Sequence, residues 1–218
     1  EIAATAARLV VEEGLEYGPA KRRALRQLGL GPRAALPDND ELEDAVREYL
    51  EVFCGDTQPG ELAALRRLAA TWMERLAPFR PHLCGAVWHG TATRLSDVYL
   101  QLFCDDPKSA EIALIDKGVD YEARTITGFQ GQPVDALSLS ARCDELGEMI
   151  GLHLMIHDHD DLRGALGYNV FGFHDRDRAM DDRTDRGPYL TLDFKFDRLE
   201  ANERGTYVFV VAHVHAQD

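Results

Sequence analysis

One segment of the sequence combines the residue types that a polyphosphate site needs. Between residues 85 and 100, an apolar run leads into Gly85, a second glycine follows at Gly90, and Ser96 and Asp97 open the next apolar run. Glycines let backbone N–H groups approach a polyphosphate closely. An aspartate at the start of a strand can hold a divalent cation that bridges the phosphates. The alternative interpretation is that the glycines and Ser96-Asp97 belong to ordinary turns.

A second set of residues has the chemistry of transition-metal ligands. His153, His157 and His159 would share one face of a strand that starts at Leu152, because alternate residues of a strand point to the same side. His213 and His215 form another such pair near the end of the chain. Histidines two apart can chelate zinc or a related metal when a third ligand converges. Since no known ligand spacing is completed, we favour histidines at strand ends over a metal site.

The first 80 residues have the periodicity of helices. Apolar residues recur at helical spacing until Gly14 interrupts them, and Asp38-Asn39-Asp40 offers caps for a later helix. Helices are expected in four segments: from residue 2 to about 13, from 19 to 28, from about 38 to 53, and from 59 to near 78.

Beyond Pro81 the pattern changes to strands and turns. Lys117-Gly118 lies between two short apolar runs, as the turn of a hairpin would. The pattern predicts strands over residues 83–87, 98–104, 111–115, 121–126 and 152–156, with a short helix over 142–149 and a helix start near 160. A charged loop over 174–186 precedes strands over 189–198 and 206–214, which we interpret as a C-terminal hairpin.

Composition limits the classes of function. The chain has 218 residues, of which 45% are hydrophobic, so it can bury a core of one ordinary domain. Its formal charge of -14 repels phosphate backbones at long range and disfavours nucleic-acid partners. No apolar run is long enough for a membrane span. The four cysteines have no CxxC spacing and are expected to be buried, reduced thiols of a cytoplasmic protein.

The segment from Gly85 to Leu100 resembles the nucleotidyltransferase fold, especially the minimal nucleotidyltransferases. That family has a Gly-Ser, a second glycine and a Ser-Asp-x-Asp at this spacing, and Gly85, Gly90, Ser96 and Asp97 match without a gap. The resemblance implies Mg²⁺-dependent transfer of a nucleotidyl group from a nucleoside triphosphate to a hydroxyl. It also implies that the glycines shape the phosphate turn, that Ser96 touches phosphate and that Asp97 holds the metal.

Three positions depart from the family pattern. Ala86 replaces the family serine, Tyr99 replaces the second carboxylate of the Asp-x-Asp pair, and His153 occupies the position aligned with the third carboxylate. Two metal ions about 4 Å apart need several carboxylates to bridge them and to offset their charge. Tyrosine is a poor ligand for Mg²⁺, which prefers carboxylate and water oxygens. The sequence therefore leaves His153 as a candidate ligand or base and does not predict a standard two-metal site.

These observations predict an α+β fold. A helical region over residues 1–80 would pack on a small mixed nucleotidyltransferase-type sheet in a core over 81–166, followed by a charged loop and a C-terminal hairpin over 167–218. Three functions remain open: a nucleotidyltransferase with Mg²⁺, a catalytically degenerate module of the same fold that binds a nucleotide or a protein partner, and a His/Asp transition-metal protein. The distance between Asp97 and His153 is the observation that bears most directly on this choice.

Overall fold

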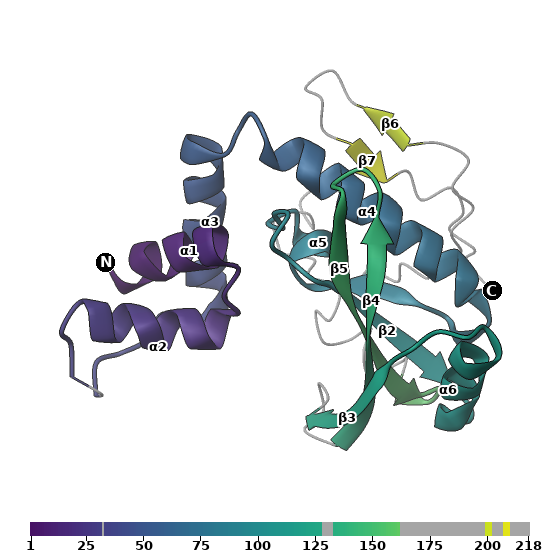
Figure 1. The fold of residues 1–218 in the computed structure, drawn as a ribbon. Helices are drawn as coiled ribbons and strands as arrows, with labels where there is room; N and C mark the ends of the chain where they lie inside the picture. Colours follow the sequence, from purple (N-terminus) through teal and green to yellow (C-terminus); the bar gives the residue numbers. More distant parts are fainter. Residues whose placement is uncertain (32, 128–132, 162–198, 202–206, 210–218) are drawn as a thin grey trace, which may run out of the picture. The chain divides into compact units, whose positions relative to one another are not determined.

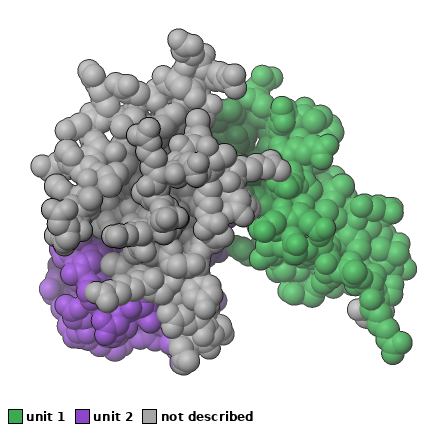
Figure 2. Space-filling view, turned by 180° about the vertical axis from the view of Figure 1, so that it is seen from behind, with its two compact units in different colours: residues 1–63, 90–96 green, residues 64–89, 97–218 purple. Residues whose placement is uncertain are grey.

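The computed structural model describes residues 1–31, 33–127, 133–161, 199–201 and 207–209 (Figure 1). The chain divides into two compact units, which Figure 2 distinguishes by colour. Unit 1 consists of residues 1–63 and 90–96, and unit 2 consists of residues 64–89 and 97–218. Unit 1 is helical and unit 2 contains a five-stranded sheet, so the predicted α+β class is confirmed. The predicted domain boundaries at residues 80 and 166 stay a prediction.

Three helices and the first turn of a fourth build unit 1. They are α1 (Ile2–Glu13), α2 (Tyr17–Gln27), α3 (Asn39–Phe53) and the beginning of α4 (Gln58–Arg75). Gly14 ends α1 in the left-handed conformation at φ 66°, where a residue without a side chain is least strained. Asp38 caps α3, because its side chain accepts from the Glu41 backbone while the Glu41 side chain accepts from that of Asp38. The core of the unit contains Ala6, Ala7, Leu9, Ala20, Ala24, Leu42 and Val46.

The segment from 90 to 96 is attached to the start of α4 within unit 1. The Gln58 side-chain amide donates to the carbonyl oxygens of Gly90, at 3.0 Å, and Ala92, at 2.9 Å. The Glu61 carboxylate accepts from the Arg94 backbone at 2.9 Å. These bonds fix a segment that forms neither helix nor strand, although residues on both sides of it in the sequence belong to unit 2.

Unit 2 contains the remainder of α4 and every strand that the structure describes. Its further elements are η1 (Ala77–Phe79), β1 (His82–Cys84), α5 (Gly85–His89), β2 (Val98–Cys104), α6 (Pro107–Asp116), β3 (Glu122–Thr127), β4 (Pro133–Cys143), β5 (Glu148–Asp158), β6 (Leu199–Ala201) and β7 (Tyr207–Phe209). Five strands form one sheet in the order β1-β2-β5-β4-β3, while β6 and β7 pair separately. Within the described five-stranded sheet, only the β2–β5 pairing is parallel, which confirms the prediction of a mixed sheet.

The two central strands have one apolar and one mixed face. Leu100, Leu102, Leu152, Leu154 and Ile156 point to the apolar face and are buried. On the other face the register sets Tyr99 opposite His153, Gln101 opposite Met155, and Phe103 opposite His157. This second face is called the mixed face below, and it carries the candidate site.

The strand predicted over residues 111–115 is wrong. Residues 111–115 belong to helix α6 and do not pair with β3 as a hairpin. The helix begins where the Asp106 side chain accepts from the Lys108 backbone at 3.0 Å and Pro107 occupies the first turn. The apparent turn at Lys117-Gly118 is the end of that helix, with Gly118 at φ 65°.

The helix predicted over residues 142–149 is also wrong. β4 continues to Cys143, β5 begins at Glu148, and the two strands pair through Cys143 and Glu148. Gly147, at φ 69°, lies in the turn between them, a conformation that favours glycine. Similarly, the strand predicted over 83–87 ends at Cys84, because residues 85–89 form the short helix α5.

The predicted C-terminal hairpin is described only in part. β6 and β7 pair in antiparallel fashion, with Leu199 opposite Phe209. Residues 162–198, which include the predicted charged loop and the predicted strand over 189–198, lie outside the described residues. Within the described part of the chain, no helix has both the length and the apolar character to cross a membrane.

Candidate functional site

Asp97 and His153 come together where the parallel pairing of β2 with β5 begins. Tyr99 and His153 are direct register partners, and Asp97 lies two residues before Tyr99 on the same side of the chain. As a result, Asp97 Oδ2 lies 3.0 Å from His153 Nε2. The structure thus brings together Asp97, the predicted metal ligand, and His153, the predicted ligand or base.

Ser138 engages the other nitrogen of the same imidazole. It is the register partner of His153 on β4, and its Oγ lies 2.9 Å from His153 Nδ1. When the imidazole is neutral, Nε2–H donates to the Asp97 carboxylate and Nδ1 accepts from the Ser138 hydroxyl. Asp97, His153 and Ser138 therefore form a continuous hydrogen-bonded chain across three strands.

Tyr99 and Gly85 lie beside this chain. The rings of Tyr99 and His153 stack with their centroids 4.7 Å apart and their planes 27° apart. Gly85 has φ 69°, and a Cβ at that position would lie 3.6 Å from Tyr99 Cδ2. The first glycine of the motif therefore adopts a backbone conformation that favours glycine and lies next to the tyrosine that replaces the second family carboxylate.

Gly151 makes room for the carboxylate of Asp97. A Cβ at Gly151 would lie 2.5 Å from Asp97 Oδ1, which is too close for any side chain. The hydrogen bond from His153 lowers the pKa of Asp97 most, its burial opposes this shift, and the His153 charge and the Gly151 backbone N–H lower the pKa further. Asp97 is therefore held as a carboxylate, as cation binding requires.

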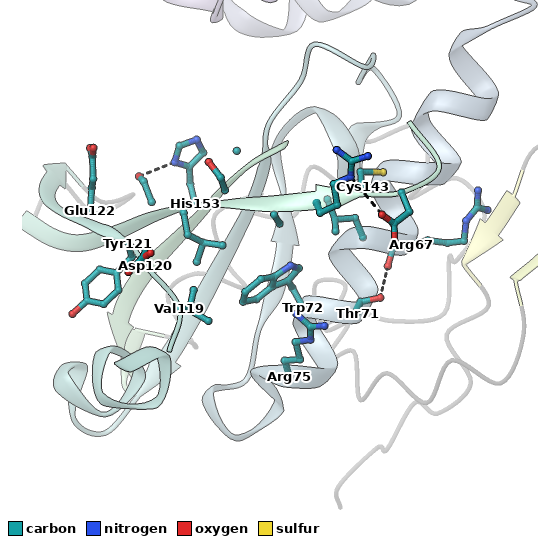
Figure 3. Close-up of a pocket in the computed structure, with 18 of the residues that line it drawn as sticks. Arg67, Thr71, Trp72, Arg75, Val119, Asp120, Tyr121, Glu122, Cys143 and His153 are labelled. Carbon is teal, nitrogen blue, oxygen red and sulfur yellow. Dashed lines mark hydrogen bonds and ion pairs between the residues drawn. The ribbon is translucent and has the colours of Figure 1, made fainter. Parts of the chain in front are cut away.

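The site is accessible to solvent and borders a pocket. The side chains of Asp97 and His153 are 45% and 26% exposed. Ser138, Gly151 and His153 also line a pocket of about 1110 Å³, whose other walls come from α4, from the segment before β3 and from residues 139–143 of β4. Figure 3 shows His153 on the sheet side of this pocket, with Trp72 and Arg75 on α4. A ligand larger than a metal ion can therefore reach His153.

Arginines of α4 attach this wall of the pocket to other elements of unit 2. Arg67 pairs with Glu145 in the turn after β4, with Arg67 Nε 2.6 Å from Glu145 Oε1. Arg66 donates to the carbonyl oxygens of Val87 and Trp88 in α5, at 3.1 and 3.3 Å. Arg75 lies over the ring of Trp72, 5.0 Å from its centroid.

Gly90 and Ser96 belong to unit 1, and each has a local structural role there. Gly90 has φ 81°, a conformation that favours glycine, and its carbonyl accepts from Gln58. Ser96 Oγ accepts from the Thr93 backbone at 3.0 Å and so closes a short turn. Their predicted contact with phosphate stays a prediction.

Within the described residues, His157 does not join His153 in a metal site. His157 lies four residues further along β5, about 13 Å away at the rise of an extended strand. Among residues 1–31, 33–127, 133–161, 199–201 and 207–209, no three His, Cys, Asp or Glu side chains converge as metal ligands. His213 and His215 lie outside that part of the chain.

The residues at the family carboxylate positions do not fit two magnesium ions. They are Asp97, Tyr99 and His153, which supply one carboxylate, one phenol and one imidazole. A two-metal centre needs bridging carboxylates to offset the charge of both ions. This donor set fits one divalent cation at most.

Sequence reasoning missed Ser138 and Gly151. The signal for Gly151 was a glycine inside an apolar strand pattern, which indicates close approach of another group. The signal for Ser138 was its alternation with apolar residues along 137–141, which places it on the polar side of a strand. Neither signal identifies the residue that Gly151 or Ser138 contacts.

Comparison with known proteins finds partial similarity to RNA uridylyl transferases. No protein-family model and no curated protein matches the chain. Among solved structures, a cytoplasmic RNA terminal U-transferase is 14% identical with a TM-score of 0.33, and the match covers 50% of this chain and 36% of that enzyme. A mutant Cid1 poly(U) polymerase bound to MgATP is 14% identical with a TM-score of 0.32, over 51% of this chain and 37% of the polymerase.

A third solved structure, Cid1 in complex with the UTP analogue UMPNPP, is 16% identical with a TM-score of 0.31. This match covers 53% of the present chain and 36% of Cid1, so the chain spans little more than a third of the length of these enzymes.

Proposed function

We propose that unit 2 binds a nucleoside triphosphate together with one divalent cation held by Asp97. The observation that carries this proposal is the Asp97–His153 pair, with Oδ2 and Nε2 3.0 Å apart where the parallel pairing of β2 with β5 begins. An ionised and accessible carboxylate is the ligand that a cation bridging phosphate groups requires. Gly85 supports the proposal because its backbone turns beside Tyr99 without a side chain that would obstruct a ligand.

Binding without transfer is the function that these residues support best. With one carboxylate where the family has three, the site lacks the ligands for a second ion that would activate an attacking hydroxyl. The cation at Asp97 would neutralise part of the triphosphate charge. Ser138 and His153 would remain hydrogen-bonded to each other and so keep the site in shape.

Nucleotidyl transfer is the second candidate function, and the position of His153 favours it. An imidazole held between Asp97 and Ser138 can act as a general base. In this reaction an acceptor hydroxyl would pass its proton to the Ser138 hydroxyl as Ser138 passes its own to His153 Nδ1, the acceptor oxygen would bond to the α-phosphorus, and pyrophosphate would leave. The acceptor is open: the matched enzymes act on RNA by name, so the prediction against nucleic-acid partners gains no support.

Calorimetry tests the proposed binding. The wild-type chain is expected to bind at least one of ATP, CTP, GTP and UTP only when a divalent cation is present, and Asp97→Ala is expected to abolish that binding. Asp105→Ala is a matched control, because Asp105 follows the other end of β2 and is 88% exposed. Absence of binding to the wild type, or equal loss in both variants, would contradict the proposal.

A labelled triphosphate separates the two candidate functions. If the site only binds, incubation with hydroxyl acceptors, short RNAs included, releases no pyrophosphate. Pyrophosphate release that disappears in both Asp97→Ala and His153→Phe would establish transfer instead.

A further inference from the structure

The cation site proposed at Asp97 has an imidazole nitrogen at the position of a family carboxylate. We infer, resting on the proposed function, that Asp97 and His153 bind the cation together and select a first-row transition ion such as Mn²⁺ over Mg²⁺. The donor atoms, their separation and the partner of the second imidazole nitrogen each bear on which ion this site binds.

The separation of the two donor atoms matches that of neighbouring ligands on one ion. Ligand atoms about 2.1 Å from an octahedral ion and at right angles to each other lie about 3.0 Å apart. Asp97 Oδ2 and His153 Nε2 are 3.0 Å apart. An ion can therefore replace the proton between the two side chains while their separation is retained.

The kinds of donor atom favour a transition ion. Mg²⁺ prefers oxygen ligands and loses its water reluctantly, whereas first-row transition ions accept imidazole nitrogen more readily than Mg²⁺ does. Mn²⁺ binds most weakly in that series, so it gives the smallest preference that a transition ion would show. Within the described residues, no third His, Cys, Asp or Glu side chain converges on this pair. The protein thus supplies two ligands, and phosphate oxygens and water would supply the others, so that the ion is held firmly only with a nucleotide.

Ser138 allows His153 to change from hydrogen-bond donor to metal ligand. When Nε2 binds an ion, the remaining ring proton must lie on Nδ1, which then donates. Ser138 Oγ is 2.9 Å from Nδ1, and a hydroxyl can accept as well as donate. The Ser138 hydroxyl therefore satisfies both forms of the imidazole and would act as a positioning residue in the metal-bound form.

The test compares two ions in two proteins. Mn²⁺ and Mg²⁺ affinities are measured with ATP present, Mn²⁺ by electron paramagnetic resonance and Mg²⁺ by competition. Because Mn²⁺ binds most protein sites more tightly than Mg²⁺, the informative quantity is the change in the affinity ratio. We expect His153→Asp, which restores an oxygen ligand, to lower the Mn²⁺/Mg²⁺ affinity ratio, because a carboxylate oxygen suits Mg²⁺ and an imidazole nitrogen does not.

His159→Asp is the matched control. His159 and Asp105 form the other described His–Asp pair of unit 2, but Nδ1 and Oδ1 are 3.9 Å apart and both side chains are exposed. The control is expected to keep the wild-type ratio. An unchanged ratio in His153→Asp, or the same change in His159→Asp, would overturn the inference.

A second variant and a spectrum cover the case in which His153→Asp does not fold. Ser138→Ala removes the partner of Nδ1 and is expected to weaken Mn²⁺ binding by about 10- to 100-fold. In ¹⁵N spectra of the wild type, Mn²⁺ should broaden His153 Nε2 strongly and leave His157 Nε2 sharp. Full Mn²⁺ affinity in Ser138→Ala, or equal broadening of both imidazoles, would contradict the inference.

The inference and the proposed function fail in different ways. If ATP binds with either ion and His153→Asp leaves the ratio unchanged, the choice of ion is wrong while nucleotide binding stands. If no nucleoside triphosphate binds but Mn²⁺ still broadens His153 selectively, the proposed function is wrong while the Asp97–His153 cation pair stands.

Discussion

The mixed face of the sheet has a solvent-exposed end, called the open end, and a buried end, called the closed end. Histidines and aromatic rings lie at both ends, but their surroundings differ. At the open end, Asp97, Tyr99 and His153 are partly exposed, and His153 is hydrogen-bonded at both ring nitrogens. At the closed end, the rings of His82 and His157 pack on Phe103, with centroids 5.2 and 5.3 Å away, and all three side chains are buried.

This contrast shows that burial and partners, more than residue type, decide what a histidine can do. His153 and His157 are four residues apart on one strand and each stacks on an aromatic ring. Burial lowers the pKa of His157, which keeps its imidazole neutral within the core. His153 has a carboxylate and access to solvent in addition, so only the open end offers ligands to a cation.

The largest expected effect is acid destabilisation through the closed end. Burial lowers the pKa of His82 from 6.5 to about 4, although Nδ1–H donates to the Arg80 carbonyl at 2.8 Å. The unfolded chain takes up this proton near pH 6.5 and the folded chain only near pH 4. Stability is therefore complete above pH 6.5 and falls by up to about 3 kcal/mol as the pH is lowered to 4.

Urea denaturation at a series of pH values measures this loss. His82→Gln removes the titrating group and should make the decline between pH 6.5 and 4 shallower, while part remains because the pKa of His157 is lowered as well. His159→Gln, which removes an exposed imidazole, should leave the decline unchanged. An identical decline of stability in wild type and His82→Gln would show that burial of His82 does not cause the loss.

The helices and strands of unit 2 were only partly predictable from the sequence. The strand over 98–104 was predicted to the residue, because a continuous apolar run ended by Asp-Asp-Pro leaves little choice. The helix over 107–116 was missed because Lys117-Gly118 was interpreted as a hairpin turn, although Asp106-Pro107 is a typical helix start. Local sequence patterns predicted an element correctly where they fitted only one kind of structure, and failed where Lys117-Gly118 fitted both a hairpin turn and a helix end.

The site itself depended on strand register. Asp97 and His153 were found through their positions relative to a family motif, whereas Ser138 was not found at all. Ser138 meets His153 only because β4 pairs with β5 in one register out of several that the alternation of apolar residues would permit. The alternation of apolar residues shows which side chains share one face of a strand, but it does not show which residue of the neighbouring strand lies opposite. Hydrogen bonds between strands therefore cannot be predicted from the sequence.

A smaller effect is expected from Gly85 at the open end. Gly85 and Gly118 both have a left-handed backbone, with φ 69° and 65°, so an alanine at either position should cost about 1–2 kcal/mol of stability. A Cβ at Gly118 meets nothing within 4 Å, whereas a Cβ at Gly85 would lie 3.6 Å from the Tyr99 ring. Gly118→Ala therefore controls for backbone strain alone.

Both variants are measured by urea denaturation and by nucleotide calorimetry. We expect equal losses of stability, together with weaker triphosphate binding in Gly85→Ala only. If Gly118→Ala weakens binding to the same extent, general destabilisation explains the effect and Gly85 has no part in the site.

The smallest effect is expected in the pKa of Asp97. His153 is the main cause of the lowered pKa, so His153→Phe, which can keep the stacking on Tyr99, should raise the pKa of Asp97 toward 3.8. The stability that this pair contributes is present above pH 3.8 and is lost as the pH falls through the lower pKa of the folded state. Because Asp97 is 45% exposed, this contribution is below about 1 kcal/mol.

Carboxyl ¹³C shifts followed with pH measure the change in the pKa of Asp97 directly. The control variant His157→Phe, at the closed end, should leave that pKa unchanged. A shift of equal size in both variants would mean that the two ends are electrostatically coupled and that the contrast between them is one of exposure alone.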